Sequence, residues 1–284
     1  MRISVVLPAK NEGDGLRKTL PRLAALYPQA ELIVVDDGST DDTAQVAASF
    51  GARVLAGPYS MGNGAAIKRG ARAASGEVLV FMDADGQHDP VHIRELLARL
   101  DDGFDMVVGA RNAEGQASRH RGWANGFYNR LASWMTGHRI DDLTSGFRVA
   151  RAERFREFLH LLPNGFSYPT TSTMAFFRSA YPVAYVPIPV ARRVGNGSHI
   201  RPFKDGVRFL LIIFKIASLY SPLKLFAPTA AAFFLAALGW YGYTFATQGR
   251  LTNMSTLLFS AAVIIFLIGL ISEQITNLTY RRDG

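Results

Sequence analysis

EVLVFMDADGQH, residues 77–88, is a nearly uninterrupted apolar run that ends in two aspartates separated by one alanine. Runs of this kind are typical of strands buried on both faces of a parallel sheet. Similar runs precede it, separated by stretches with helical periodicity. The expected strands are residues 3–8, 31–37, 52–57 and 77–83, and the expected helices are residues 15–26, 40–50 and 63–74. This alternation predicts an α/β domain with a mostly parallel sheet and helices on both faces, an architecture of the nucleotide-binding type.

Ligands of such sheets bind beyond the carboxyl ends of the strands, so the residues that follow each strand are candidate site residues. They are Asn11 and Glu12, then Asp36 and Asp37, then Asp83 and Asp85. Two carboxylates at the end of a buried strand repel each other and are costly to desolvate unless a cation compensates them. Their hard oxygen atoms favour Mg²⁺ or Mn²⁺ over Zn²⁺, so Asp83 and Asp85 are predicted metal ligands. The alternative is a helix N-cap at Asp85 or Asp89.

Two further motifs surround the predicted nucleotide site. In VVDDGSTDDT, residues 34–43, Thr40 or Asp41 suffices to cap the following helix, so Asp36 and Asp37 are free to accept hydrogen bonds from a base or a ribose. GPYSMGNGAAIKRG, residues 57–70, is a glycine-rich loop that opens a helix. Its backbone N–H groups could contact phosphate, or the loop could be a plain turn.

The pattern changes after Arg111, where glycine, arginine and aromatic residues become frequent. A helix is expected at residues 122–135, and short strands are expected near residues 147–151 and 183–187. We expect this second half of the domain to shape the site of the acceptor substrate.

Two uncharged runs near the C-terminus, residues 225–245 and 252–272, are each long enough to cross a bilayer as a helix. Residues 203–224 mix basic and apolar side chains, as expected of a helix lying in the membrane interface. The sequence therefore predicts a catalytic domain at residues 1–202, an interfacial segment at 203–224 and a two-helix membrane anchor at 225–279.

Charge distribution predicts the orientation of this anchor. Basic residues flank the two runs on their outer sides: Arg201, Lys204, Arg208, Lys215, Lys224, Arg281 and Arg282. By the positive-inside rule both flanks are cytoplasmic. The N-terminal apolar stretch is too short for a signal peptide, so the catalytic domain is expected in the cytosol. The net charge of +8 clusters beside the runs, which favours anionic membrane lipids over nucleic acid as the partner.

LPAKNE, VVDDGSTDDT, GNGAAIKRG, DADGQH, VVGAR, TSGFR and RVGNGSHIRP occur in this order along residues 1–202. The set resembles the motifs of family-2 inverting glycosyltransferases, in particular the polyprenyl-phosphate sugar synthases typified by dolichyl-phosphate mannose synthase. The resemblance implies a GT-A fold, a nucleotide-sugar donor, Mg²⁺ or Mn²⁺ as cofactor and a polyprenyl phosphate acceptor. It also implies an integral protein of a prokaryotic inner membrane with its catalytic domain in the cytoplasm.

The resemblance also assigns roles to individual residues. It places donor-binding residues at Pro8, Lys10, Glu12, Val35, Asp37, Asp83, Ala84 and Gln87, with Asp83, Asp85 and Gln87 at the metal. Lys10 stands where an aromatic residue is commoner. The implied catalytic residues are Asp85, Arg111 and Arg193, and the implied acceptor-binding residues are Ser145, Arg148 and Ser198. Arg192 is an alternative to Arg193, because the spacing of the nearby glycines differs from the family pattern and His199 replaces a lysine.

The acceptor is left open between two chemistries. A polyprenyl phosphate is already anionic and needs arginines rather than a general base. A hydroxyl acceptor, as in polysaccharide or glycolipid synthesis, needs a carboxylate base, for which Asp141 and Asp142 are the candidates. A membrane-bound nucleotide sensor without catalysis is a third possibility, disfavoured by the intact pair Asp83 and Asp85.

Overall fold

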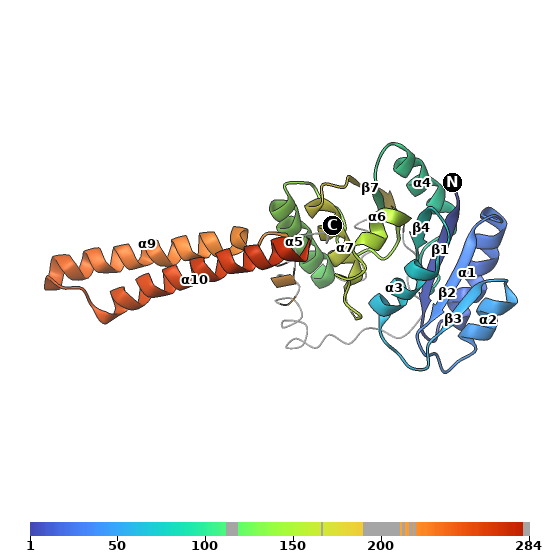
Figure 1. The fold of residues 1–284 in the computed structure, drawn as a ribbon, viewed down its shortest axis with the longest axis horizontal. Helices are drawn as coiled ribbons and strands as arrows, with labels where there is room; N and C mark the ends of the chain where they lie inside the picture. The colour runs from blue at the N-terminus through green and yellow to red at the C-terminus, as the bar shows by residue number, and fades with distance from the viewer. Residues whose placement is uncertain are drawn as a thin grey trace. The chain divides into compact units, whose positions relative to one another are not determined.

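A computed structural model describes residues 1–111, 119–165, 167–189 and 220–280, together with residues 211, 214, 215 and 218. The chain forms two compact units, Met1–Gly206 and Val207–Gly284. The first unit contains all the strands in the described part of the chain, and the second contains two long helices (Figure 1).

The first unit alternates strands and helices in its N-terminal half, as predicted. Its strands are β1 (Ile3–Ala9), β2 (Glu31–Asp36), β3 (Arg53–Ala56), β4 (Val78–Phe81), β5 (Met106–Arg111), β6 (Arg148–Arg151) and β7 (Val183–Ile188). Its helices are α1 (Gly13–Leu26), α2 (Thr43–Ser49), α3 (Asn63–Ala73), η1 (Pro90–His92), α4 (Ile93–Asp101), α5 (Arg119–Thr136), α6 (Ala152–Glu157) and α7 (Tyr168–Arg178).

The seven strands form one sheet in the order β3-β2-β1-β4-β6-β5-β7. The pairs β1 with β2, β1 with β4, β2 with β3 and β5 with β7 are parallel. Only β6 runs the other way, between β4 and β5. The predicted mostly parallel α/β architecture is confirmed, and β6 brings the residues just before it to the middle of the sheet.

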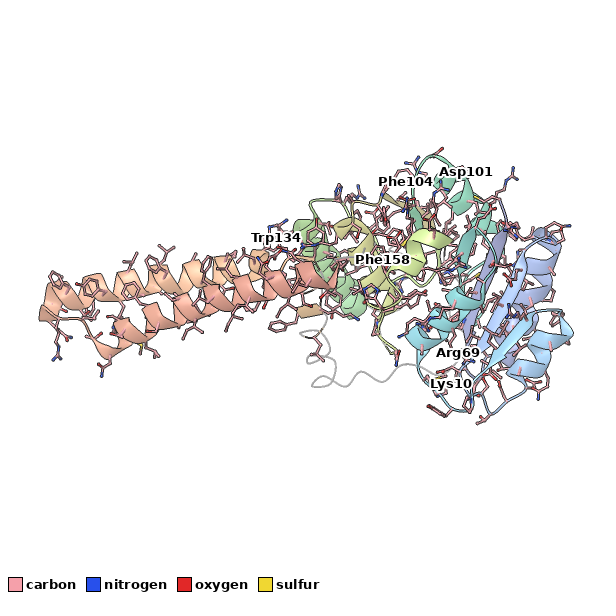
Figure 2. The ribbon with its side chains drawn as sticks, in the orientation of Figure 1. Lys10, Arg69, Asp101, Phe104, Trp134 and Phe158 are labelled. Atoms are coloured by element: carbon pink, nitrogen blue, oxygen red, sulfur yellow. The ribbon has the colours of Figure 1, made fainter. Side chains whose placement is uncertain are left out.

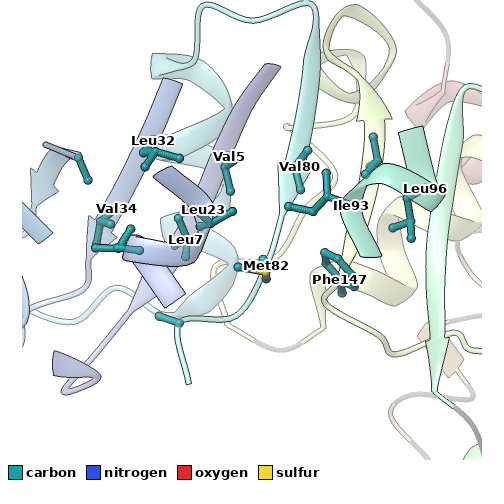
Figure 3. Close-up of a cluster of buried hydrophobic side chains, with 14 of the residues drawn as sticks. Val5, Leu7, Leu23, Leu32, Val34, Val80, Met82, Ile93, Leu96 and Phe147 are labelled. Atoms are coloured by element: carbon teal, nitrogen blue, oxygen red, sulfur yellow. The ribbon is translucent and has the colours of Figure 1, made fainter. Parts of the chain in front are cut away.

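Both faces of the sheet are covered, which explains the continuous apolar runs. Val5 and Leu7 belong to a core cluster that also contains Leu16 and Leu23 of α1 and Ile93 of α4 (Figure 3). The intervening residue Val6 points to the opposite face, where α3 packs closely: a Cβ on Gly70 would lie 2.3 Å from Val6 Cγ1. Because consecutive strand residues point to opposite faces, both sets must be apolar.

The second unit is a hairpin of α9 (Pro222–Gln248) and α10 (Asn253–Thr279), whose positions match the two predicted uncharged runs. Gly249 closes α9 with φ 63°, and Thr252 caps α10 by accepting a hydrogen bond from the Ser255 N–H at 3.4 Å. Most of the predicted interfacial segment 203–224 lies outside the described residues.

Small side chains line the seam between α9 and α10. They recur every seven residues, at Ala230, Ala237 and Thr244 on α9 and at Ser255, Ala262, Gly269 and Thr276 on α10. Small residues at this spacing let two helix backbones approach closely, as in membrane helix pairs. The most apolar windows of α9 and α10 have mean hydropathies of 1.5 and 2.5 and are only 11% and 17% buried, so neither is a core helix of this structure. Both are candidate membrane spans.

Candidate active site

The loops after β1 and β2 are tied together at the carboxyl edge of the sheet. Asn11 adopts φ 55°, and its Oδ1 accepts a hydrogen bond from the Thr40 N–H at 2.8 Å. The Asn11 N–H in turn donates to Ser39 Oγ at 2.9 Å. Asp41 accepts the Thr43 N–H at 3.1 Å at the start of α2. The predicted convergence of strand-end polar residues on one edge is therefore present, and Asp36 and Asp37 are not needed for this cap.

Asp83 and Asp85 lie in the turn that follows β4. Helix α1 packs tightly on this turn, since a Cβ on Gly15 would lie 2.1 Å from the carbonyl oxygen of Ala84. Asp85 Oδ1 accepts the Gln87 N–H at 3.1 Å, within the turn itself. Asp89 caps η1 by accepting the Val91 N–H at 3.1 Å, so the cap belongs to Asp89 and not to Asp85.

The electrostatics of this turn suit a divalent cation. Burial and the neighbouring charge of Asp85 raise the pKa of Asp83 to about 6, although Arg111 and Arg148 pull it in the other direction. A nearby cation would favour the ionised form of both carboxyls. Mg²⁺ typically binds to one or two protein carboxylates and completes its shell with water and phosphate oxygens. Among the described residues no group of three His, Cys, Asp or Glu side chains could hold a metal, so two carboxylates fit a metal shared with a diphosphate rather than a closed structural site.

Arg111, the last residue of β5, is held by Asp142. Its Nε donates to Asp142 Oδ2 at 2.7 Å, and its Nη2 donates to Asp142 Oδ1 at 2.9 Å and to Thr144 Oγ1 at 2.6 Å. Bidentate pairing of this kind fixes the plane of a guanidinium. The Nη1 group makes no hydrogen bond within the described part of the chain, and the charge of Arg111 acts on Asp83. Arg111 is thus oriented and still has donors for a phosphate.

The same contacts exclude Asp142 as a general base in this structure. Its oxygens also accept the backbone N–H groups of Arg111, Thr144 and Ser145 at 3.0–3.2 Å. Burial alone would raise the pKa of Asp142, but its hydrogen bonds and the Arg111 charge lower it below the usual range. The other candidate base, Asp141, pairs with Arg139 at 2.7 Å. The carboxylate that a hydroxyl acceptor would require is therefore not found at Asp142.

The side chains of Ser145 and Arg148 are engaged inside the protein, and their acceptor role, inferred from the sequence, stays a prediction. Ser145 is 2% exposed, and its hydroxyl donates to the Gly109 carbonyl at 2.6 Å. Arg148 is fully buried, and its guanidinium donates to the carbonyls of Ser145 and Pro169 and to the hydroxyl of Ser172. Arg148 lies on β6, in the middle of the sheet. Its hydrogen bonds hold neighbouring segments together there.

A cavity of about 260 Å³ opens beside Asp83. It is lined by Asn63, Asp83, Thr144, Gly146, Gly165, Ser167, Tyr168 and Pro169. Gly146 is in close contact with the turn that follows β4, since a Cβ there would lie 2.8 Å from Asp83 Oδ2. The Tyr168 hydroxyl donates to the Gly146 carbonyl at 2.9 Å. The segment TSGFR therefore forms a wall next to the predicted metal ligands through its backbone rather than through its buried side chains.

Asp37 holds a loop at this edge of the sheet, and its role at the nucleoside stays a prediction. It is 5% exposed, and its carboxylate accepts the N–H groups of Met61 and Gly62 at 2.7 and 2.9 Å and the Ser60 hydroxyl at 2.7 Å. Burial would raise the pKa of Asp37, but these hydrogen bonds and the charge of Lys10 lower it.

The other residues predicted to bind the nucleotide-sugar donor differ in how exposed their side chains are. Lys10 is exposed just after β1 (Figure 2), and Pro8 and Glu12 are half-buried. Val35 is fully buried within β2 and Ala84 is 2% exposed, so their side chains are closed to a donor. Gln87 is half-buried in the turn that follows β4.

The glycine-rich loop is engaged by the protein itself. The Ala65 N–H donates to the Asn164 carbonyl at 2.9 Å, and a Cβ on Gly64 would lie 2.0 Å from the Pro163 carbonyl oxygen. Lys68 donates to the Leu162 carbonyl at 3.2 Å and to the Asn164 side chain. These contacts favour the turn interpretation over phosphate binding, because several of the N–H groups involved already have protein acceptors.

Several residues at this edge were not predicted. Tyr59 is 66% exposed in the loop after β3, and its backbone packs on Gly38. An exposed aromatic in a glycine-rich loop was a signal available in the sequence. His88 is 7% exposed and stacks on Phe147 at 5.0 Å, and burial lowers its pKa to about 4.

The predicted residues Arg193 and Ser198, with the alternative Arg192, lie outside the described residues.

Residues 4–180 match the family model of glycosyl transferase family 2, and residues 221–278 match that of the GtrB C-terminal hairpin. An uncharacterised glycosyltransferase of Mycobacterium tuberculosis is 33% identical over 202 residues, which cover 70% of this chain and 89% of that protein. The polyprenol monophosphomannose synthase of Mycolicibacterium smegmatis is 30% identical over 230 residues, which cover 70% of this chain and 83% of that protein.

Among solved structures, the chain is similar to glucosyl-3-phosphoglycerate synthase of Mycobacterium tuberculosis in complex with Mn²⁺, UDP and glucosyl-3-phosphoglycerate. The two share 26% identity with a TM-score of 0.61, over 76% of this chain and 79% of the other.

Proposed function

Because the chain belongs to glycosyltransferase family 2, we propose that it transfers one sugar from a nucleotide-sugar donor to a polyprenyl phosphate, with inversion at the anomeric carbon. The observation that carries this proposal is the grouping of Asp83 and Asp85 with Arg111 at the carboxyl edge of the sheet. Two carboxylates for a cation and one oriented arginine are the groups that a diphosphate leaving group and a phosphate acceptor require.

The comparisons support this choice of substrates. A relative with 30% identity is named a polyprenol monophosphomannose synthase, and a structural neighbour binds Mn²⁺ together with UDP.

A divalent cation bound by Asp83 and Asp85, with Gln87 in the same turn, would neutralise the diphosphate as it leaves. The Arg111 guanidinium, held by Asp142, would bind a phosphate through its Nη1 group without reorganising during the reaction. The acceptor phosphate is already anionic, so its oxygen can attack the anomeric carbon opposite the leaving group without a base. The engagement of Asp142 by six protein donor groups agrees with this chemistry and disfavours a hydroxyl acceptor.

The hairpin α9–α10 is proposed to anchor the enzyme in the inner membrane, with residues 1–202 on the cytoplasmic side. Large apolar side chains such as Leu235, Phe245 and Ile264 are 66%, 57% and 56% exposed, which suits contact with lipid chains. A membrane anchor would bring the enzyme to the surface that holds a polyprenyl acceptor and supplies anionic lipids as partners.

The test is transfer by the purified full-length protein in lipid nanodiscs. UDP-glucose and GDP-mannose, each radiolabelled in the sugar, are incubated with undecaprenyl phosphate and Mg²⁺ or Mn²⁺. We expect label in the organic phase that mild acid releases, because a sugar linked through one phosphate is acid-labile. Label transferred equally well to undecaprenol, or to a sugar hydroxyl without any lipid phosphate, would contradict the proposed acceptor.

A further inference from the structure

The proposed cation site in the turn after β4 and the hydrogen bonds of Arg111 leave the cavity beside Asp83 without an assigned ligand. We propose that it receives the sugar ring of the donor and that the Asn63 side chain hydrogen-bonds the hydroxyl groups of that ring. The inference rests on the proposed function, because it assigns one part of the donor site. It identifies Asn63, at the first turn of α3, as a residue that determines sugar specificity.

The chemistry of the cavity wall favours a neutral, hydroxyl-rich ligand. None of its described lining residues carries a positive charge, and Asp83 contributes a carboxylate. A phosphate would find no cationic side chain on this described wall, whereas sugar hydroxyls can hydrogen-bond to its amide and carbonyl groups. Tyr168 and Pro169 also line the cavity and are largely buried, with Tyr168 2% exposed. Burial raises the pKa of Tyr168 above its ordinary value, so this wall stays uncharged.

Position and size agree with a single sugar ring. In a nucleotide sugar the ring is bonded to the second phosphate, so it must lie next to the cation that binds the diphosphate. The cavity shares Asp83 with that proposed cation site. Its volume of about 260 Å³ lies below the roughly 300–1,000 Å³ of sites for drug-sized ligands, which suits one ring better than a whole nucleoside.

Asn63 is a lining residue whose side chain offers both hydrogen-bond donors and an acceptor. Its side chain is exposed and makes no hydrogen bond within the described part of the chain. By contrast, Thr144 accepts from Arg111 at 2.6 Å, and Ser167 caps α7 through the Thr170 N–H at 3.4 Å. An amide offers two N–H donors and one acceptor oxygen, which can distinguish the orientation of neighbouring hydroxyls.

The backbone around Asn63 is fixed, so the amide is presented from a rigid wall. Asp37 holds the N–H of Gly62 just before it, and Asn164 accepts the N–H of Ala65 just after it. Lys68, one turn along α3, binds the same 162–164 segment. Preorganised walls of this kind are what a selective binding site needs.

The experiment separates the sugar from the nucleotide by comparing two ligands. Calorimetry with Mn²⁺ measures the affinity of the full-length enzyme for UDP-glucose and UDP, and for GDP-mannose and GDP. For the pair that wild type binds, Asn63→Ala should weaken nucleotide-sugar binding about tenfold and leave nucleoside diphosphate binding unchanged. Arg72→Ala, an exposed position on the same helix outside the cavity, is the matched control and should change neither affinity.

Other results would overturn the assignment. Equal weakening of both ligands would place Asn63 at the nucleotide, and an increase confined to the KM for undecaprenyl phosphate would give the cavity to the acceptor. Unchanged affinities in Asn63→Ala would remove the residue from the donor site while leaving the proposed function intact. Failure of the wild-type enzyme to bind any nucleotide sugar would instead contradict the proposed function itself. Equal melting temperatures of the variants exclude unfolding as the cause of a loss.

Discussion

Asp142 receives Arg111 in a bidentate ion pair, with Nε–Oδ2 and Nη2–Oδ1 distances of 2.7 and 2.9 Å, and only 8% of the Asp142 side chain is exposed. The pair joins the end of β5 to the loop just before the TSGFR segment, residues 144–148. Asp142 is therefore a positioning residue that acts through Arg111, and its replacement should affect both stability and catalysis.

Asp142→Asn should lower the free energy of unfolding by roughly 3 kcal/mol, because a half-buried guanidinium loses its counter-charge. It should also lower kcat by up to about 100-fold through misplacement of Arg111. Chemical denaturation and initial rates of transfer measure the two effects. If Asp142 were instead a general base, the variant would keep wild-type stability and lose the ionisation of a base from its pH–rate profile.

The same pair predicts how stability depends on pH. The pKa of Asp142 is lower in the folded protein than in the unfolded chain, where an aspartate has a pKa of about 3.9. The stabilisation is thus complete above pH ~5 and is lost as the pH falls below about 4, through the folded pKa. The stability difference between wild type and Asp142→Asn should stay constant from pH 7 to 5 and shrink below that. A difference that grows on acidification would contradict the assignment.

Asp85→Asn should reduce transfer by at least about 10²–10³-fold with little change in melting temperature, because it removes a proposed metal-ligand charge at a strand end. Mn²⁺ titration followed by electron paramagnetic resonance, with nucleoside diphosphate present, should show weaker binding. Asp89→Asn is the matched control, since it makes the same change four residues away and asparagine still caps η1. Wild-type turnover in Asp85→Asn would contradict the metal site.

Tyr59 could supply the aromatic surface that Lys10 does not. Its ring is 66% exposed in the loop that Asp37 holds, at the edge where a nucleoside is expected. Tyr59→Ala should raise the KM for the donor about tenfold, equivalent to roughly 1.4 kcal/mol of stacking, while Tyr59→Phe stays near wild type. Phe50→Ala, at the C-terminal end of α2, removes another exposed aromatic as a control. Equal KM values for Tyr59→Ala and wild type would exclude stacking.

The fold could be predicted from sequence largely because burial on both faces leaves a continuous signal. Val5, Val6 and Leu7 are all fully buried, and this is what an uninterrupted apolar run predicts. The direction of β6 could not be predicted, because four residues with two arginines carry no such signal. The burial of Arg148 follows from that central position, so its structural role was equally hidden.

At the site, the positions of polar residues could be predicted more reliably than their hydrogen-bond partners. Asp37 and Asp142 both stand out in the sequence as polar residues beside the site, but the donors to Asp37 come from a loop 23 or more residues away, and the arginine that pairs with Asp142 comes from the end of β5. Sequence patterns indicate where a carboxylate sits on its own strand or loop. They do not indicate which neighbouring segment packs against it, and that packing decides whether the carboxylate meets protein or ligand.

The hairpin predicts a specific membrane topology. At 27 residues each, α9 and α10 are about 40 Å long, enough to cross a hydrocarbon core of roughly 30 Å. Basic residues flank the outer ends, so residues 249–252 should lie on the far side of the membrane from the catalytic unit. The chain has no cysteine, so single cysteines at Gln248, Asp101 and Thr279 report on each side without background. In intact cells a membrane-impermeant maleimide should label Gln248→Cys, whereas Asp101→Cys and Thr279→Cys should react only after permeabilisation. Labelling of Thr279→Cys from outside, with Gln248→Cys protected, would show that the hairpin is inserted in the opposite orientation.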